Sequence, residues 1–255
     1  MVDIAVKSSS LADWIKPGPF STDVKKYVSE RENAKDALEG VINIFDWMAH
    51  LGYSKEFAEA ASGQLDPIKK TLAIPGFVEA LGDMRDKWHI LNNSDDQDAF
   101  TNLTTSTAVA TLNLSESAMA VDAWGIYPLK EGLKAAKTGF WASAGLLDGI
   151  SFFRELSKAE HLRKKVDGVI DPELKNIYQH RIQLCYLNVL KATTTLAMAS
   201  IALISLLFAS LAHGFLFSPV VFLTLCSAWL ILTYTTYFYG KMIDRWENDL
   251  PTGMV

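Results

Sequence analysis

The chain divides into a long part with apolar positions at helical spacing and a later part without charged side chains. Residues 192–240 form a run of 49 residues that contains no Asp, Glu, Lys or Arg. An α-helix rises about 1.5 Å per residue, so about 20 residues cross a hydrocarbon core of about 30 Å. The run is too long for one buried helix. It fits two membrane spans, 192–212 and 215–239, joined by a tight turn at His213 and Gly214.

Basic residues lie on the outer ends of this run, whereas the turn between the two spans has no Lys or Arg. The flanking cations are Arg181, Lys191, Lys241 and Arg245. Because positive residues prefer the cytoplasmic side of a membrane, the pattern predicts both termini in the cytosol and the turn in the lumen. Aromatic side chains gather where the second span ends, as in the interfacial belt of membrane proteins. They are Tyr234, Tyr237, Tyr239 and Trp246.

The residues before the run predict successive helices, and no segment alternates with period two for long enough to predict a strand. One helical face falls between residues 38 and 49, and Gly52 is placed to end that helix. Ser54 predicts the start of a short helix over 55–62, and the pair at 66–67 (Asp-Pro) predicts the start of another. A further break is expected at Pro75. The fold class is therefore all-α, a cytosolic helical bundle followed by a two-helix transmembrane hairpin.

These breaks predict five parts along the chain. They are a flexible N-terminal segment (1–20), a helical cytosolic domain (21–168), a juxtamembrane helix (173–191), the membrane hairpin (192–240) and a short cytosolic tail (241–255).

Two segments of the helical domain are nearly uncharged. Residues 108–129 contain only Glu116 and Asp122 as charges, and residues 138–153 contain only Asp148. Each segment fits a core helix of the bundle, an interfacial helix or a short membrane insertion. Their length and embedded acids favour core or interface over spanning.

Composition narrows the range of functions. The chain has 255 residues and a net charge of −5, which argues against a broad nucleic-acid surface. Two cysteines, Cys185 and Cys226, are too few for a disulfide framework and fit the role of small apolar residues. Residues 1–19 contain four charges and no sustained apolar segment, so they do not read as a secretory signal.

No group of residues predicts an active site. The five histidines form no HExxH motif, and the chain has no CxxC pair, no phosphate-binding glycine loop and no GxSxG motif. Acid pairs such as Asp95 with Asp96, and Glu247 with Asp249, are typical of helix caps and a solvated tail. We therefore expect a protein that is not an enzyme, with no catalytic, cofactor-binding or metal site.

The plan of a helical N-terminal part and a bilobed apolar hairpin at 192–240 resembles the inclusion membrane (Inc) proteins of chlamydiae. Residues 74–82 and 123–129 are also similar to the class I-accessible type of Inc protein. Many members place the hairpin nearer the start of the chain than it lies here. The resemblance implies type III secretion into a host cell and insertion into the vacuole (inclusion) membrane. The helical part would then face the host cytosol as an effector that recruits host proteins.

A second, weaker resemblance is to the peroxin-eleven family of peroxisome-elongation proteins. This chain has a similar length, a helical N-terminal part and late apolar segments. Residues 31–36 resemble part of the N-terminal Gly-Arg-Asp-Lys motif of that family, but the glycine is missing and members are usually basic. This resemblance implies remodelling of the peroxisomal membrane by amphipathic helices.

The hairpin itself leaves a third alternative, a pore-forming protein. In every case the expected partners are a lipid bilayer, proteins on the cytosolic side and a second copy of the chain through the hairpin, not nucleic acid.

Overall fold

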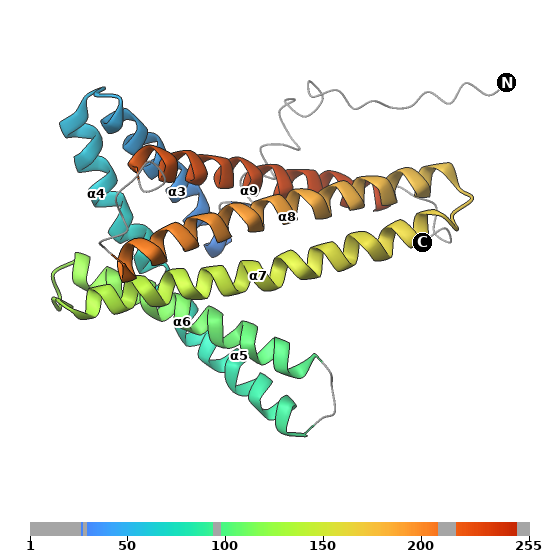
Figure 1. Cartoon of the computed structure of the whole chain (residues 1–255), viewed down its shortest axis with the longest axis horizontal. Helices are drawn as coiled ribbons and strands as arrows, with labels where there is room; N and C mark the ends of the chain where they lie inside the picture. The colour runs from blue at the N-terminus through green and yellow to red at the C-terminus, as the bar shows by residue number, and fades with distance from the viewer. Residues whose placement is uncertain (1–26, 28–29, 94–97, 209–217, 249–255) are drawn as a thin grey trace.

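The computed structural model describes residues 27, 30–93, 98–208 and 218–248. These residues are almost entirely helical and contain no strand, which confirms the all-α prediction (Figure 1). With the labels of Figure 1, the helices are α3 (Arg31–His50), α4 (Lys55–Thr71), α5 (Ala73–Asn93), α6 (Ala99–Ala123), α7 (Gly132–Val166), α8 (Pro172–Leu207) and α9 (Pro219–Asn248).

The α3–α4 turn confirms one predicted boundary and corrects the next. Helix α3 ends at His50, and Gly52 supplies the left-handed backbone of the turn with φ +79°. Ser54 also adopts a left-handed conformation and makes no capping hydrogen bond with its side chain. The helix that it precedes is not the short segment expected at 55–62, because α4 continues to Thr71.

The predicted helix start at Asp66 and Pro67 is wrong, since both residues lie inside α4. The Asp66 carboxylate pairs with Lys70 one turn later instead of capping a helix. Pro67 has no N–H to donate to the carbonyl of Gly63, so α4 lacks one backbone hydrogen bond at this point. The break expected at Pro75 falls three residues earlier, and Pro75 lies in the first turn of α5, where its missing N–H is tolerated.

The three longest helices, α7, α8 and α9, lie side by side (Figure 1). Helix α8 joins the predicted juxtamembrane helix and the first predicted span without a break. Its start is fixed by Asp171, whose carboxylate accepts hydrogen bonds from the backbone N–H of Glu173 (2.7 Å) and of Leu174 (3.0 Å). Helix α3 packs on α9, α6 packs on α7, and the α5–α6 pair projects away from the long helices.

Small residues allow the helices to approach closely around α7. A Cβ atom at Gly139 would lie 2.8 Å from the hydroxyl oxygen of Ser115 on α6, and one at Gly145 would lie 3.3 Å from Ala199 on α8. The α6 side of this packing contains many buried residues. Its buried residues include Ala108, Ala110, Asn113, Ser115, Glu116, Met119 and Ala120. Among the alternatives for the nearly uncharged segment 108–129, the part within α6 is therefore a core helix.

Candidate functional site: the apolar hairpin and its polar network

Helices α8 and α9 are each long and apolar enough to cross a membrane. Within the most apolar 18-residue stretch of each, 28% of α8 and 17% of α9 is buried. Neither stretch is mostly buried, unlike the core helix of a soluble protein, so the two helices are compatible with a membrane protein. Large apolar side chains on the exposed faces include Leu190, Ile204, Leu207, Val220 and Ile231.

The two helices are antiparallel, as a hairpin requires. Arg181 near the start of α8 pairs with Glu247 near the end of α9, and Lys191 lies over the ring of Trp229. The end of α8 and the start of α9 therefore lie at the same end of the bundle. The predicted turn at His213 and Gly214 falls outside the described residues.

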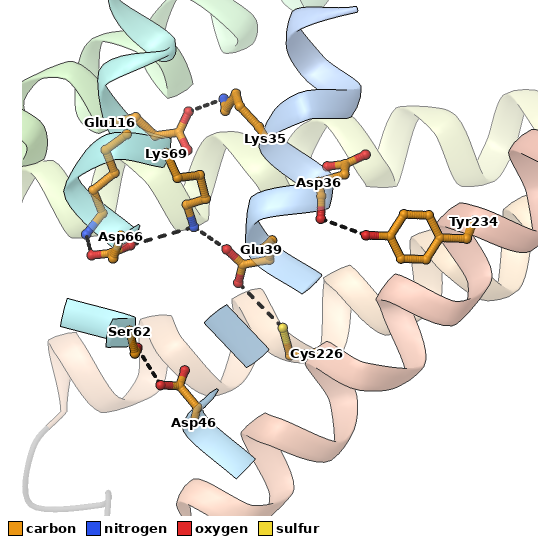
Figure 2. A network of polar contacts seen from close by, with 11 residues as sticks. Lys35, Asp36, Glu39, Asp46, Ser62, Asp66, Lys69, Glu116, Cys226 and Tyr234 are labelled. Carbon is orange, nitrogen blue, oxygen red and sulfur yellow. Dashed lines mark hydrogen bonds and ion pairs between the residues drawn. The ribbon is translucent and has the colours of Figure 1, made fainter. Parts of the chain in front are cut away.

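A polar face of helix α3 packs against the apolar part of α9. The Tyr234 hydroxyl donates a hydrogen bond to the backbone carbonyl of Asp36 at 3.0 Å, and the Cys226 thiol lies 3.6 Å from a carboxylate oxygen of Glu39 (Figure 2). Gly40 makes this approach possible, because a Cβ atom there would lie 2.7 Å from the Tyr234 oxygen. Charged residues of α3 thus meet α9 in the middle of the predicted second span.

One turn further along α3, two more polar side chains contact α9. The hydroxyl of Ser227 donates to Asn43 Oδ1 at 2.8 Å, and the indole N–H of Trp47 donates to the same hydroxyl at 2.9 Å. These contacts join residues that are about 180 positions apart along the chain.

Ion pairs connect this face of α3 to α4 and α6. Lys69 on α4 pairs with Glu39, and Lys35 pairs with Glu116 on α6 at 2.5 Å (Figure 2). Lys35 and Glu116 are 8% and 4% exposed, so this pair is shielded from water. We call the residues that hold α3 on α4, α6 and α9 the polar network: Lys35, Asp36, Glu39, Asn43, Trp47, Lys69 and Glu116 on one side, and Cys226, Ser227 and Tyr234 on α9.

The contacts of the polar network keep the side chain of Lys69 charged. Burial by itself would lower the pKa of Lys69, but the Glu39 carboxylate, which also accepts a hydrogen bond, and Asp66 outweigh it and raise the pKa. The charge on Lys69 is therefore present across the physiological pH range. A buried charge of this kind is stable only while its partners stay in place.

The predicted flanking cations lie in different surroundings. Arg181 makes hydrogen bonds to Glu247 (2.8 Å) and to Asp244 (2.7 Å), and the bonds to Glu247 are the main reason that its pKa is raised. Arg245 lies in the last turn of α9. Arg181 therefore joins the polar ends of α8 and α9 to each other.

The two flanking lysines lie at different positions along the axis of the α8–α9 hairpin. Lys191 faces Trp229, whereas Lys241 lies over Tyr237, beyond Gly240 and its neighbour Leu184 on α8. Trp229 and Lys241 are twelve positions apart in the sequence, which is about 18 Å along a helix. The second half of the apolar run on α9 thus lies beside the polar half of α8.

The predicted interfacial aromatics also contact protein. Tyr237 packs edge-on against Tyr27 with ring centres 4.6 Å apart. The Tyr239 hydroxyl lies 2.6 Å from His180 Nδ1, and the Trp246 ring lies 5.0 Å from the same imidazole. An aromatic belt at a membrane surface stays a prediction.

The sequence pointed to part of this site. Glu116 stood out as an acid in an apolar segment, and it is one half of the buried ion pair. Lys35, Glu39 and Lys69 were missed, because each lies in an ordinary charged stretch with no local sign of a distant partner. The Ser227 hydroxyl gave no signal either, since small polar residues are common in membrane helices.

The described residues include no group of three or more His, Cys, Asp or Glu side chains placed to hold a metal ion. Cys185 is buried, and burial raises the pKa of its thiol to about 11. That thiol is therefore protonated at neutral pH and is not a reactive thiolate.

Comparison of the chain with protein-family models, with curated proteins and with solved structures gave no match.

Asp148, the single acid in the apolar middle of α7, provides a test of the α7–α8 contact. Burial raises the pKa of its carboxyl, against the opposing effects of Thr195 and Lys191. A carboxyl with a raised pKa in the folded state costs stability when it is ionised, and this cost disappears as the pH falls through that pKa.

We expect Asp148→Asn to raise the midpoint of thermal unfolding at pH 7 and to leave it unchanged near pH 4, where the unfolded carboxyl titrates (pKa about 3.9). Tryptophan fluorescence in a non-ionic detergent measures both midpoints. If the unfolding midpoint rose equally at both pH values, the effect would come from the packing of the asparagine side chain and not from the lost charge.

Proposed function

We propose that this chain is a non-enzymatic membrane protein whose α8–α9 hairpin inserts into a bilayer from one side. The observation that carries the proposal is the low burial of the two apolar helices, 28% and 17% over their most apolar stretches. The basic residues at the outer ends of the run favour cytosolic positions for both chain termini.

Insertion requires the polar network to separate from the hairpin. A charged side chain at the centre of a bilayer costs about 2.5–3.5 kcal/mol even by the lowest estimates. Glu39, Lys69 and the Lys35–Glu116 pair lie against or close behind the middle of α9. Helix α9 therefore exchanges its contacts with α3 for lipid when it spans, and the arrangement in Figure 1 is the form of the protein outside the bilayer.

The helical domain is proposed to bind proteins at the cytosolic face of that membrane. The α5–α6 pair projects from the long helices and exposes large apolar side chains on its surface (Figure 1). Val78 is 67% exposed, Trp88 is 55% exposed and Phe100 is 69% exposed. Exposed apolar side chains of this size are typical of interaction surfaces. With the Inc resemblance, this surface supports a secreted effector that recruits host proteins to a vacuole membrane.

Pore formation is the second candidate. The polar network supports it, because a pore-forming protein must keep its hairpin packed until it reaches a membrane. Peroxisomal remodelling by a surface helix over 108–153 has less support, since the α6 part of that segment is buried.

Insertion predicts that the full chain resists extraction from membranes by alkaline carbonate. We expect a variant with Ile204→Arg and Ile231→Arg to be released, because each arginine adds about 2.5–3.5 kcal/mol to the cost of insertion. Both isoleucines are exposed, 39% and 65%, so the packed form tolerates these changes. Immunoblots of pellet and supernatant measure the two fractions.

Ile170→Arg is the matched control, since Ile170 is 99% exposed and lies outside the apolar run. This control should remain in the pellet with the unmodified chain. Release of the unmodified chain would contradict the proposal. Tags at both termini should be cleaved by protease added to sealed membranes, and protection of either tag would contradict a hairpin with both ends in the cytosol. Dye leakage from liposomes that depends on the hairpin would favour the pore.

A further inference from the structure

A cavity of about 500 Å³ lies at the centre of the bundle, where six helices meet. Helices α3, α4, α6, α7, α8 and α9 all contribute to its lining. Its volume is in the range of sites that hold small organic ligands, about 300–1,000 Å³. Residues of the ion pairs Lys35–Glu116 and Lys69–Glu39, which Figure 2 shows, form part of its lining.

The two halves of the lining differ in chemistry. One half is aromatic and apolar, and it is formed by Phe140, Trp141, Met198, Phe222 and Trp229. Within it the Trp141 and Phe222 rings meet edge to face with their centres 5.5 Å apart. The other half carries charged side chains from α3, α4, α6 and α7. A ligand that satisfies both halves has an apolar body and a charged end.

The charged half favours an anion. Four lysines and three acids line it, and three of the lysines are already paired: Lys35 with Glu116, Lys69 with Glu39 and Lys70 with Asp66 just outside the lining. Lys137 on α7 is exposed at this lining, and among the described residues no carboxylate lies within ion-pair distance of its ammonium group. Its charge is therefore available to a ligand.

From this combination we propose that the cavity binds a single-chain anionic amphiphile, with the acyl chain among the aromatic residues and the acidic head at Lys137. The head is a carboxylate or a phosphate, as in a free fatty acid or a lysophospholipid. A neutral apolar ligand or an uncharged sugar leaves Lys137 unused. The site exists in the packed form of the protein, in which α3 contacts α9. It does not depend on the membrane insertion proposed above.

The test uses the full chain in a non-ionic detergent and photoactivatable probes of equal chain length. One probe is a diazirine-labelled palmitic acid, one is the corresponding lysophosphatidic acid, and two controls carry an ammonium or a neutral glycerol head. We expect either anionic probe, or both, to label peptides that contain Trp141, Met198 or Phe222, with at least fivefold less labelling by the two controls. Mass spectrometry locates the labelled peptides, and competition by the unlabelled acids gives the affinities.

Lys137→Gln is expected to weaken binding of the anionic probes about tenfold, the usual effect of losing one charge-assisted contact. Lys134→Gln, one turn earlier on the exposed surface of α7, is the matched control and should leave binding unchanged. Labelling by one acid alone assigns the head as carboxylate or phosphate. Equal labelling by the four probes, labels spread over the exposed faces of α8 and α9, or no effect of Lys137→Gln would each overturn the proposal. Carbonate extraction does not depend on Lys137, so failure of the cavity site and failure of membrane insertion give different results.

Discussion

Replacement of Glu116 by alanine is expected to lower the free energy of unfolding of the packed form by about 3–5 kcal/mol. The reason is the surroundings of its partner. Lys35 is 8% exposed and its ammonium lies 2.5 Å from the Glu116 carboxylate. Without that carboxylate the buried ammonium group of Lys35 loses its ion-pair contact of 2.5 Å, and breaking a buried ion pair is among the most destabilising single changes. Thermal and urea unfolding, followed by tryptophan fluorescence, measure the loss.

Two controls separate the buried pair from an ordinary loss of charge. Glu160 pairs with Lys164 at 2.8 Å on the exposed surface of α7, and Glu160→Ala should leave the unfolding midpoint unchanged. The double variant Lys35→Met with Glu116→Leu removes both charges and fills their volume, so it should recover most of the lost stability. If Glu116→Ala and Glu160→Ala behave alike, the α3–α6 ion pair does not hold the packed form together.

A covalent link between α3 and α9 is expected to prevent insertion of the hairpin. The side chains of Asn43 and Ser227 are in contact at 2.8 Å, so we place cysteines at these two positions and verify the disulfide by the mobility of the oxidised protein on a non-reducing gel. The variant also carries Cys185→Ala and Cys226→Ala to avoid other pairings. Because the oxidised link holds charged α3 on the middle of α9, we expect the carbonate-resistant fraction to fall at least tenfold. A reducing agent should restore it.

A second disulfide, between cysteines at Leu184 and Gly240, is the matched control. It joins α8 to α9, which move into the bilayer together, and a Cβ atom at Gly240 would lie 3.5 Å from Cδ2 of Leu184. This link should leave carbonate resistance intact. Full insertion of the oxidised α3–α9 variant would show that the hairpin spans with α3 still attached, and the proposed separation would be wrong.

The hairpin and most helices could be predicted from the sequence because the signals are local. An uncharged run of 49 residues and a helical face that ends at Gly52 depend only on neighbouring residues. The errors arose where a local signal had a distant or competing explanation. Asp66 resembled a helix cap, but its carboxylate is held by Lys70 one turn later.

The polar network could not be predicted, because its contacts depend on the tertiary arrangement. Asp36 and Tyr234 are 198 positions apart, and nothing near either residue identifies the other. The different positions of Lys191 and Lys241 along the hairpin axis also depend on the tertiary arrangement. In the sequence both lysines simply flank the run, and only the antiparallel packing places Lys191 beside Trp229.

The long separation between α3 and α9 has a consequence for the order in which the protein is made. Helix α3 leaves the ribosome early, and its partner Tyr234 follows 198 residues later. At about 5–20 residues per second, α3 waits roughly 10–40 s before its partner on α9 exists. During that time the newly made first apolar helix is without α9, and the α3–α9 contacts cannot form before α9 has left the ribosome. If the hairpin inserts as proposed, this interval is the time in which a chaperone or a targeting factor can reach the first apolar helix before α3 and α9 pack together.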